Sequence, residues 1–395
     1  MAKHPQKTQP LKKSHYVDGR PPFECIALLL QGGGALGSYQ AGVYEALAEA
    51  DLQPDWVAGI SIGAINAAII AGNPPKDRVA KLREFWTGIS LTSGPTWVED
   101  WISSMIRGDN ARNSLNQFHA NQAAISGVPG FYAPRLPGPW FYPPGSPEST
   151  SIYDTTPLLA TLERLVDFDR LNNDGMRFSI GAVNVRSGNF SYFDTTTHKI
   201  TPAHVMASGA LPPGFPAIEI EGEYYWDGGL VSNTPLSWVL NSESREDTLA
   251  FQVDLWSARG PFPRDMPEVM MREKEIQYSS RTRANTDSFK KMQRLRCALG
   301  TLLKKLPPEL RESEEAKLLE GATSNKVYNI VHLIYRAAAY EGQSKDYEFS
   351  LRTMEEHWKA GYNDAIRTLR HPEVLEPPSR MEGTRVFDLG SDSRD

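Results

Sequence analysis

The sequence alternates between short apolar runs and segments with helical periodicity, and this alternation restricts the folds open to the chain. The apolar runs have the length expected of buried strands and cover residues 25–30, 56–59, 178–185, 249–255 and 327–335. Helical patterns follow the first two runs, at residues 38–50 and 64–71. Strands interleaved with helices predict a largely parallel sheet with helices on both faces. We therefore expect an α/β protein of three-layer α/β/α architecture.

Three segments fall outside this alternation and indicate how the chain is divided. Residues 1–22 are predicted to be a flexible basic tail. Residues 127–147 are too rich in proline and glycine for a regular strand or helix, so we expect either a surface loop or part of a substrate rim. Residues 256–395 are mainly helical in pattern and are expected to complete or cover the core of a domain at residues 23–255.

The composition narrows the classes of function. The 395-residue chain has 42 Lys and Arg against 48 Asp and Glu, and its formal net charge of −6 argues against a general nucleic-acid binder. The two cysteines, Cys25 and Cys297, are too few for a disulfide framework, and no Cys/His cluster suggests zinc. We therefore expect a reducing, cytoplasmic environment. No apolar run approaches the ~20 residues needed to span a bilayer, and none resembles a secretory signal.

A glycine-rich loop directly follows the first predicted strand. Residues 26–47 read IALLLQGGGALGSYQAGVYEAL, so Gly32, Gly33 and Gly34 stand between a strand and a helix. Glycines allow backbone N–H groups to turn toward an anion, and the start of a helix favours negative charge. The loop therefore predicts a site for a negatively charged group.

The same loop also fits a dinucleotide-binding pattern, because Gly32, Gly34 and Gly37 have the spacing G-x-G-x-x-G. In dinucleotide-binding folds, however, the acidic residue that binds the ribose ends the second strand. Here Asp51 and Asp55 both precede the second predicted strand. This order weakens the nucleotide hypothesis, which is kept as an alternative without catalysis.

A second motif, Gly59-x-Ser61-x-Gly63, lies between the second predicted strand and a helix of small residues. In this context a tight turn exposes a nucleophilic serine, and the glycines relieve crowding around it. The alternative is an ordinary turn in which the serine caps the helix. The position of the motif favours Ser61 as a nucleophile.

An activated serine needs a base, and the residues alone leave two choices open. None of the eight histidines stands in a recognisable motif, but His204 and His371 remain rivals for the role. Asp227 is better placed, since it ends a short strand and enters Gly228 and Gly229. Asp-Gly is also a common hairpin turn, so this pattern is not decisive by itself.

Taken together, these segments resemble the bacterial patatin-like phospholipases. The matching pieces occur in the family's order over about residues 25–255: QGGGALGSYQAGV, GISIG, YDTTPL, ASGALPPGFP and DGGLVSNTP. The resemblance implies the patatin-like α/β/α fold and hydrolysis of lipid acyl esters without a metal or organic cofactor. Residues 256–395 resemble an extension found in one bacterial subgroup, for which no role is implied.

The resemblance also implies a role for each motif. Ser61 would be the nucleophile and Asp227 its partner in a Ser–Asp dyad. The oxyanion hole would be formed by backbone N–H groups of the glycine-rich loop, namely those of Gly32, Gly33 and Gly34. Because an ordinary aspartate is a weak base, such a dyad requires a partly desolvated Asp227 held against Ser61.

Two rival functions remain besides nucleotide binding. A Ser–His–Asp carboxylesterase would also use Ser61, but its elbow normally follows several strands, whereas only two precede Ser61 here. A membrane-docking module without catalysis is the other rival. Replacing histidines singly would separate the first from a dyad, and release of fatty acid would exclude the second.

A basic helix suggests contact with a membrane surface. Residues 281–305 contain an apolar stripe with basic flanks, which is typical either of a packed helix or of one that touches anionic lipid. The stripe consists of Met292, Leu295, Leu299, Leu302 and Leu306; the basic residues include Lys290, Lys291, Arg294 and Arg296. With the aromatic loop at residues 131–142, this helix is expected to bring the protein transiently to anionic lipid at the inner face of the membrane.

Overall fold

A nine-stranded mixed sheet forms the centre of the molecule in the computed structural model, which describes residues 15–91, 109–242, 245–279, 282–337 and 341–390. Residues 1–14 of the predicted tail lie outside these ranges. The parallel strands are, in sheet order, β11 (Thr384–Phe387), β10 (Tyr328–Ile334), β9 (Thr248–Asp254), β1 (Cys25–Leu30), β2 (Trp56–Gly59) and β5 (Arg177–Asn184). The antiparallel strands β6 (Phe190–Asp194), β8 (Glu223–Asp227) and β7 (Ile218–Ile220) continue the sheet beyond β5.

The register of the central strands brings their carboxyl ends to one edge. Leu30, the last residue of β1, pairs with Gly59 at the end of β2 and with Val253 near the end of β9. The glycine-rich loop and the Ser61 turn therefore emerge side by side. This is the edge at which open α/β sheets usually bind ligands.

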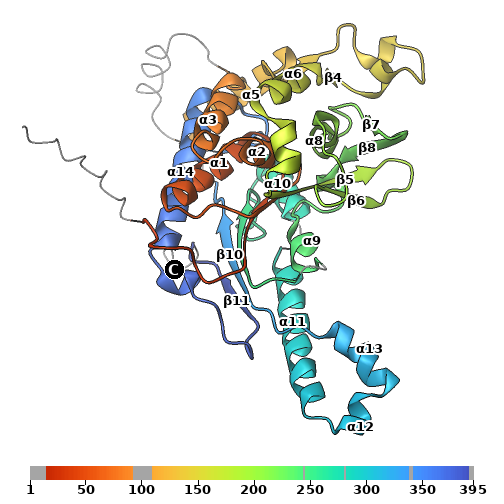
Figure 1. Cartoon of the computed structure of the whole chain (residues 1–395). Helices are drawn as coiled ribbons and strands as arrows, with labels where there is room; N and C mark the ends of the chain where they lie inside the picture. The colour runs from red at the N-terminus through yellow and green to blue at the C-terminus, as the bar shows by residue number, and fades with distance from the viewer. Residues whose placement is uncertain (1–14, 92–108, 243–244, 280–281, 338–340, 391–395) are drawn as a thin grey trace, which may run out of the picture.

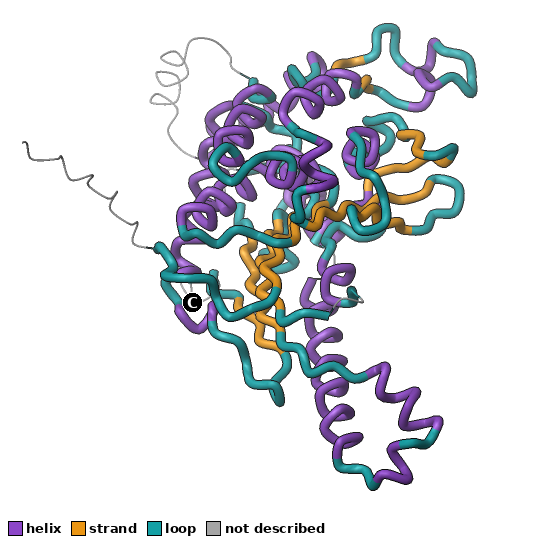
Figure 2. Tube along the Cα trace, viewed as in Figure 1, coloured by secondary structure: helices purple, strands orange, loops and turns teal. Residues whose placement is uncertain are grey.

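Helices cover both faces of the sheet. Side chains along β1 point alternately to the two faces, so each face contributes apolar residues to a core. Leu28 and Leu30 join a large core with α1 (Ser38–Glu49), α2 (Ile62–Ala71), α3 (Arg78–Gly88) and α14 (Leu351–Leu369). Ala27 and Leu29 join a smaller core with α9 (Leu236–Leu240) and α11 (Thr282–Lys304). Figures 1 and 2 show the two helical layers with the strands between them. The predicted three-layer fold is confirmed.

The remaining helices lie around this framework. They are α5 (Asp109–Ser126), α6 (Thr156–Leu165), α7 (Phe168–Asn173), α8 (Pro202–Ser208), α10 (Met266–Tyr278), α12 (Pro308–Arg311) and α13 (Glu314–Ala322). Strands β3 (Ala133–Pro134) and β4 (Tyr153–Asp154) pair in antiparallel orientation. Most of the proline-rich segment lies between them in the chain. In Figure 1, α11, α12 and α13 form an arm that projects from the body.

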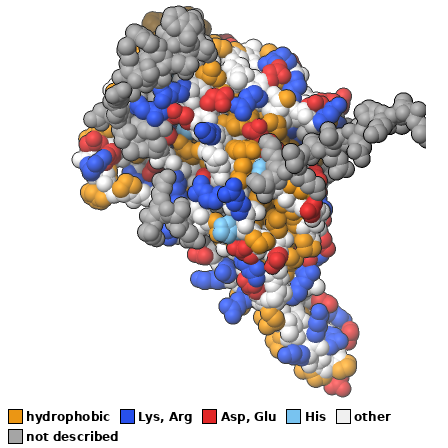
Figure 3. All heavy atoms as spheres, turned by 90° about the vertical axis from the view of Figure 1, so that its left-hand side faces the viewer, with side chains coloured by type: hydrophobic (Ala, Val, Ile, Leu, Met, Phe, Trp, Pro, Cys, Tyr) orange, Lys and Arg blue, Asp and Glu red, His pale blue; other side chains and the backbone are white. Residues whose placement is uncertain are grey.

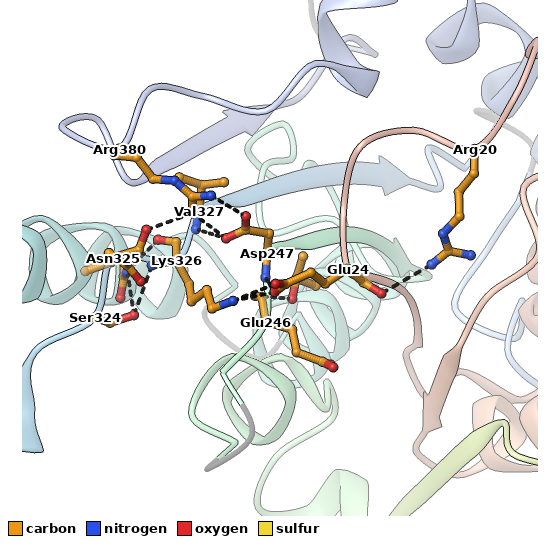
Figure 4. A network of polar contacts seen from close by, with 11 residues as sticks. Arg20, Glu24, Glu246, Asp247, Ser324, Asn325, Lys326, Val327 and Arg380 are labelled. Carbon is orange, nitrogen blue, oxygen red and sulfur yellow. Dashed lines mark hydrogen bonds and ion pairs between the residues drawn. The ribbon is translucent and has the colours of Figure 1, made fainter.

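Residues beyond 255 contribute to the sheet itself, since β10 and β11 extend it next to β9. A polar network fastens these strands at their amino ends (Figure 4). Lys326 Nζ donates to the Glu24 carboxylate at 2.6 Å, and the Arg380 guanidinium binds both oxygens of Asp247 at 2.6 and 2.7 Å. The Asp247 carboxylate also accepts from Val327 N at 3.0 Å. The predicted domain boundary at residue 255 thus falls between strands of one sheet, and the boundary itself stays a prediction.

Three of the five residues of the predicted apolar stripe are exposed, contrary to the simpler of the two expectations, whereas Leu299 and Leu306 are half-buried. Met292, Leu295 and Leu302 are 49%, 64% and 58% exposed. The buried face of the helix instead carries Phe289 and Cys297. From the side shown in Figure 3, the arm presents hydrophobic, basic and acidic side chains in mixture.

Helices α1 and α14 cross in backbone contact. A Cβ on Gly361 would lie 2.0 Å from the Tyr39 carbonyl oxygen, and a Cβ on Gly42 would lie 1.9 Å from the Trp358 carbonyl oxygen. Neither oxygen can move without shifting its helix. The two helices therefore require glycine at both positions.

We predict that Gly361→Ala destabilises the fold by roughly 1–3 kcal/mol or more, because overpacking forces the helices apart. Gly321→Ala is the matched control, since Gly321 lies in α13 and a Cβ there meets nothing within 4 Å. That change should be neutral or stabilise by about 1 kcal/mol through helix propensity. Denaturant unfolding of both variants measures the difference, and equal stabilities would contradict the prediction.

Candidate active site

Ser61 occupies a strained turn between β2 and α2. Its backbone has φ 56° and ψ −124°, an unfavourable conformation for a residue with a side chain. Its N–H donates to Ser208 Oγ at 3.0 Å, and Ser208 Oγ donates in turn to Gly181 O at 2.7 Å. The strain thus coincides with the predicted nucleophile.

The elbow glycines allow the turn to close. A Cβ on Gly59 would lie 2.2 Å from the carbonyl oxygen of Gly63, and a Cβ on Gly63 would lie 2.2 Å from that of Leu30. Both contacts are with backbone atoms, which cannot move aside. Side chains at these positions would therefore displace the serine.

Asp227 faces Ser61 directly. Ser61 Oγ donates to Asp227 Oδ2 at 2.6 Å, and the other carboxylate oxygen, Oδ1, accepts from Gly229 N at 2.7 Å. The Asp227 N–H donates to Ala210 O at 3.0 Å, which fixes the backbone where β8 ends and Gly228 begins a short 3-10 turn. The structure thus brings together the two side chains that the sequence proposed as partners.

Burial makes Asp227 a better proton acceptor than an ordinary aspartate. The residue is only 2% exposed. Desolvation raises the pKa of Asp227 to about 6, although hydrogen bonds from Ser61 and Gly229 oppose the rise. The carboxylate is therefore still ionised at neutral pH but holds a proton more strongly than it would in water.

Two backbone donors of the glycine-rich loop stand beside the serine. Among the hydrogen bonds of the described residues, none uses the N–H of Gly33 or Gly34, and both glycines line the cavity with Ser61. Gly32 corrects the prediction, because its N–H already donates to Asn233 O at 3.2 Å. The role of Gly33 and Gly34 as oxyanion donors stays a prediction.

The cavity beside the Ser61–Asp227 pair has a volume of about 470 Å³ and is mainly apolar. Its lining includes Ile65, Leu158, Met206, Leu211, Phe215 and Phe349. Phe131 and Tyr132, from the start of the proline-rich segment, and Tyr153 of β4 complete one wall through ring contacts with Phe215. A cavity of this kind suits an acyl chain better than a polar substrate.

The rival bases lie elsewhere. No histidine belongs to the cavity lining in the part of the chain that the structure describes. His204 Nδ1 accepts from Thr201 N at 3.1 Å, and burial lowers the pKa of His204 to about 4. His371 is half-exposed and pairs with Glu373 at 3.2 Å. Within the described residues, neither histidine forms a hydrogen bond with Ser61 or Asp227.

The glycine-rich loop offers few free donors to a nucleotide. Besides Gly32, the N–H of Ala35 donates to Asp346 O at 2.8 Å and that of Leu36 to Gly33 O at 3.2 Å. Asp51 lies at the far end of α1 and does not line the cavity. Across the described ranges, no group of three or more His, Cys, Asp or Glu side chains could hold a metal ion.

Sequence reasoning missed several residues that shape this site. Four of them hold the loops in place through hydrogen bonds: Gln31, Ser208, Asn233 and Trp256. Gln31, Ser208 and Asn233 fall inside the matched motifs, so the resemblance could have identified them. Trp256 carries no local signal, because it follows β9 and reaches the loop only through the parallel register.

Comparison with known families agrees with this geometry. A family model described as patatin-like phospholipase matches residues 28–239, more than half of the chain. The chain belongs to the patatin-like phospholipase family. This confirms the part of the prediction that names the patatin-like phospholipase family. A second model, described as patatin phospholipase, matches residues 276–381 and so covers much of the predicted extension.

Individual relatives are more distant. Lysophospholipase nte1 of Aspergillus terreus is 30% identical over 125 residues, which make up 24% of this chain and 8% of that protein. An uncharacterized NTE family protein of Mycobacterium tuberculosis is 35% identical over 113 residues, 27% of this chain and 18% of that protein. The chain thus spans less than a fifth of these relatives.

One solved structure aligns over most of the chain. The alignment with VipD from Legionella pneumophila covers 98% of this chain and 77% of VipD, with 15% identity and a TM-score of 0.41.

Within the described residues, no helix combines the length and apolar character needed to span a bilayer.

We predict that replacing Asp227 with asparagine stabilises the fold as the pH rises. The pKa of Asp227 is higher in the fold than its ordinary 3.8, so the stability contributed by this group is fully present below about pH 4 and is lost as the pH rises through about 6. Asparagine cannot ionise. The free energy of unfolding of Asp227→Asn, relative to that of wild type, should therefore rise by roughly 3 kcal/mol between about pH 4 and pH 8. Denaturant unfolding across this range measures the gap. A gap independent of pH would contradict the prediction.

Proposed function

We propose that the chain cleaves carboxylic ester bonds of lipids with a Ser61–Asp227 dyad, through an acyl-enzyme. The observation that carries the proposal is the 2.6 Å hydrogen bond from Ser61 Oγ to the buried Asp227 carboxylate, in the lining of an apolar cavity. The reaction belongs to the phospholipase A, lysophospholipase or esterase type. No metal or organic cofactor is required by this chemistry.

The first half-reaction acylates the serine. Ser61 Oγ attacks the ester carbonyl carbon while its proton passes to Asp227 Oδ2, and the carbonyl oxygen becomes an oxyanion beside the N–H groups of Gly33 and Gly34. As the oxyanion collapses, the bond to the alcohol oxygen breaks. The departing alcohol takes the proton from Asp227.

The second half-reaction releases the acid. A water molecule attacks the acyl carbon and gives its proton to Asp227, which now acts as a general base again. Collapse of the second tetrahedral intermediate returns the proton to Ser61 Oγ and frees the fatty acid. The pKa of about 6 suits Asp227 to both directions of transfer, since it lies close to neutral pH.

Access to lipid is best explained by the segment beside the cavity. The rim loop (residues 135–152) begins at β3 and returns at β4, and Ile152 N and Tyr153 N fasten it to Pro213 O and Gly214 O at 3.1 and 2.9 Å. Leu136, Trp140 and Phe141 are 85%, 82% and 79% exposed on it. We propose that these side chains insert into a lipid surface and bring the cavity to its substrate.

The basic helix is a separate element. Figure 1 places the α11–α13 arm and β4 at opposite ends of the molecule, so the two features need not act together as the sequence suggested. Contact of the exposed Lys290, Lys291 and Arg294 with an anionic inner membrane face remains a proposal. We propose a cytoplasmic location because the two cysteines, Cys25 and Cys297, are free and buried, as expected in a reducing environment.

We predict that Ser61→Ala and Asp227→Asn each lower kcat for a short-chain ester by at least ~10³-fold, because nucleophile and base act as one unit. His204→Ala and His371→Ala should leave kcat within about twofold. Steady-state kinetics on folded variants measures the effects. Loss of activity in a histidine variant would replace the dyad by a triad.

The wild-type pH profile gives an independent check. Only ionised Asp227 can accept the serine proton, so kcat/KM should fall about tenfold for each pH unit below about 6. A profile that stays flat down to about pH 4 would show that another group is the base.

We predict that Trp140→Ser/Phe141→Ser lowers hydrolysis of lipid in neutral vesicles about tenfold or more, since two apolar anchors are lost. Hydrolysis of a soluble short-chain ester should not change. Leu318→Ser/Leu319→Ser is the matched control, because these side chains are 79% and 42% exposed on the arm. Equal loss in both variants would contradict a specific role for the rim loop.

The arm is tested on anionic vesicles. Replacing Lys290, Lys291 and Arg294 by Gln should weaken sedimentation with them at low salt, and the difference should fade at high salt. Wild-type binding by this variant would make α11 a structural element only.

A further inference from the structure

The carbonyl group of Gly32 is held by two side-chain donors from distant parts of the chain. Asn233 Nδ2 donates to Gly32 O at 2.9 Å, and Trp256 Nε1 donates to the same oxygen at 3.0 Å. Both donors are buried, with Asn233 and Trp256 only 3% exposed. The two bonds together occupy the accepting capacity of this oxygen.

This carbonyl shares its peptide unit with a proposed oxyanion donor. In a trans peptide the C=O of Gly32 and the N–H of Gly33 point in opposite directions. Fixing one therefore fixes the other. We propose that Asn233 and Trp256 are positioning residues, which hold the Gly32 carbonyl away from the substrate so that the Gly33 N–H faces the developing oxyanion. This inference rests on the proposed function of Ser61.

We call the two hydrogen bonds from Asn233 and Trp256 to Gly32 O the clamp. Without this clamp the Gly32–Gly33 peptide would be free to turn over. Gly32 and Gly33 both lack a Cβ, so rotation of the peptide between them meets little steric resistance. A turned peptide would present a carbonyl dipole to the oxyanion, and stabilisation would become repulsion. The same absence of side chains that opens the loop to substrate thus makes the clamp necessary.

The clamp is itself braced by Gln31. The Gln31 side-chain oxygen accepts from Leu255 N and Trp256 N at 2.6 and 3.0 Å, which places the indole. Its amide nitrogen donates to Thr234 Oγ1 at 3.0 Å, next to Asn233 in the chain. The carbonyl of Tyr278 accepts from both Gln31 Nε2 and Asn233 Nδ2, at 3.2 and 2.9 Å. The loops after β8 and β9 and the last residue of α10 therefore converge around this peptide.

The other side of the loop is fixed independently. Gly34 has φ +56°, and a Cβ there would lie 2.1 Å from Asp346 O, the oxygen that accepts from Ala35 N. Asp346 is paired with Lys274 at 2.9 Å. Removal of the Asn233 and Trp256 bonds should therefore disturb the Gly32–Gly33 peptide while the Gly34 turn stays in place.

The test compares a reactive and an unreactive ligand. A trifluoromethyl ketone with an acyl tail forms a tetrahedral oxyanion adduct with a nucleophilic serine, whereas the matching ether only fills the cavity. For Asn233→Ala and for Trp256→Phe, we expect kcat and ketone affinity to fall together by about 10- to 100-fold. KM and ether affinity should change by less than about twofold.

Asn329→Ala is the matched control. Asn329 is also fully buried, and its Nδ2 donates to two carbonyls, Val374 O and Glu376 O, at 2.7 and 2.9 Å in another part of the sheet. It should lower thermal stability without lowering ketone affinity. If ketone and ether affinities fall equally in the Asn233 variant, or if ketone affinity is unchanged, the positioning role is overturned.

Two further outcomes keep the test decisive. If Asn233→Ala does not fold, Trp256→Phe decides, since it keeps an aromatic ring at this position and removes the Nε1 donor. A fluorophosphonate probe read by mass spectrometry separates this inference from the proposed function. If the probe does not label Ser61 in the wild-type protein, Ser61 is not the nucleophile and the proposed function is wrong. If the probe labels the wild-type protein and both variants at equal rates, only the positioning role of Asn233 and Trp256 is wrong.

Discussion

The hydrogen bond between Ser61 and Asp227 joins residues that are 166 positions apart. The rest of the fold holds the two side chains together and shields the Asp227 carboxylate from water. Ser61 leaves the sheet at the end of β2, whereas Asp227 arrives on β8, which runs antiparallel to β5 and pairs Asp227 with Ala182. The pair therefore depends on a sheet that changes from parallel to antiparallel at β5. Burial at this junction raises the pKa of Asp227, as the proposed role of this carboxylate as a base requires.

The parts of the structure that follow from local sequence could be predicted well. The observed β1 and β2 have the predicted bounds, because short apolar runs between turn residues leave few alternatives. Ser61 and Asp227 could be named because Ser61 closely follows a strand and Asp227 ends one, each in a recognisable turn. That they meet came only from the family resemblance, since neither periodicity nor spacing places β8 relative to β2.

Features that depend on tertiary contacts could not be read in this way. The donor role predicted for Gly32 fails because Asn233 O, 201 residues away, accepts its N–H. The apolar stripe on α11 has the periodicity of a packed face, yet Met292 and Leu295 are exposed, and the body contacts Phe289 and Cys297 instead. Periodicity shows which residues share a helix face, but it does not show whether another element covers that face.

Residues after 255 take part in the site as well as in the sheet. Trp256 holds the Gly32 carbonyl, Asp346 O accepts from Ala35 N, and Phe349 lines the cavity. The glycine-rich loop thus lies between one segment that bears the catalytic motifs and another that fixes the loop's shape. A loop built of glycines has little conformational preference of its own, so its order must be supplied by its neighbours. Because those neighbours come from both regions of the chain, we expect the oxyanion hole to form only when the whole sheet from β11 to β8 has assembled.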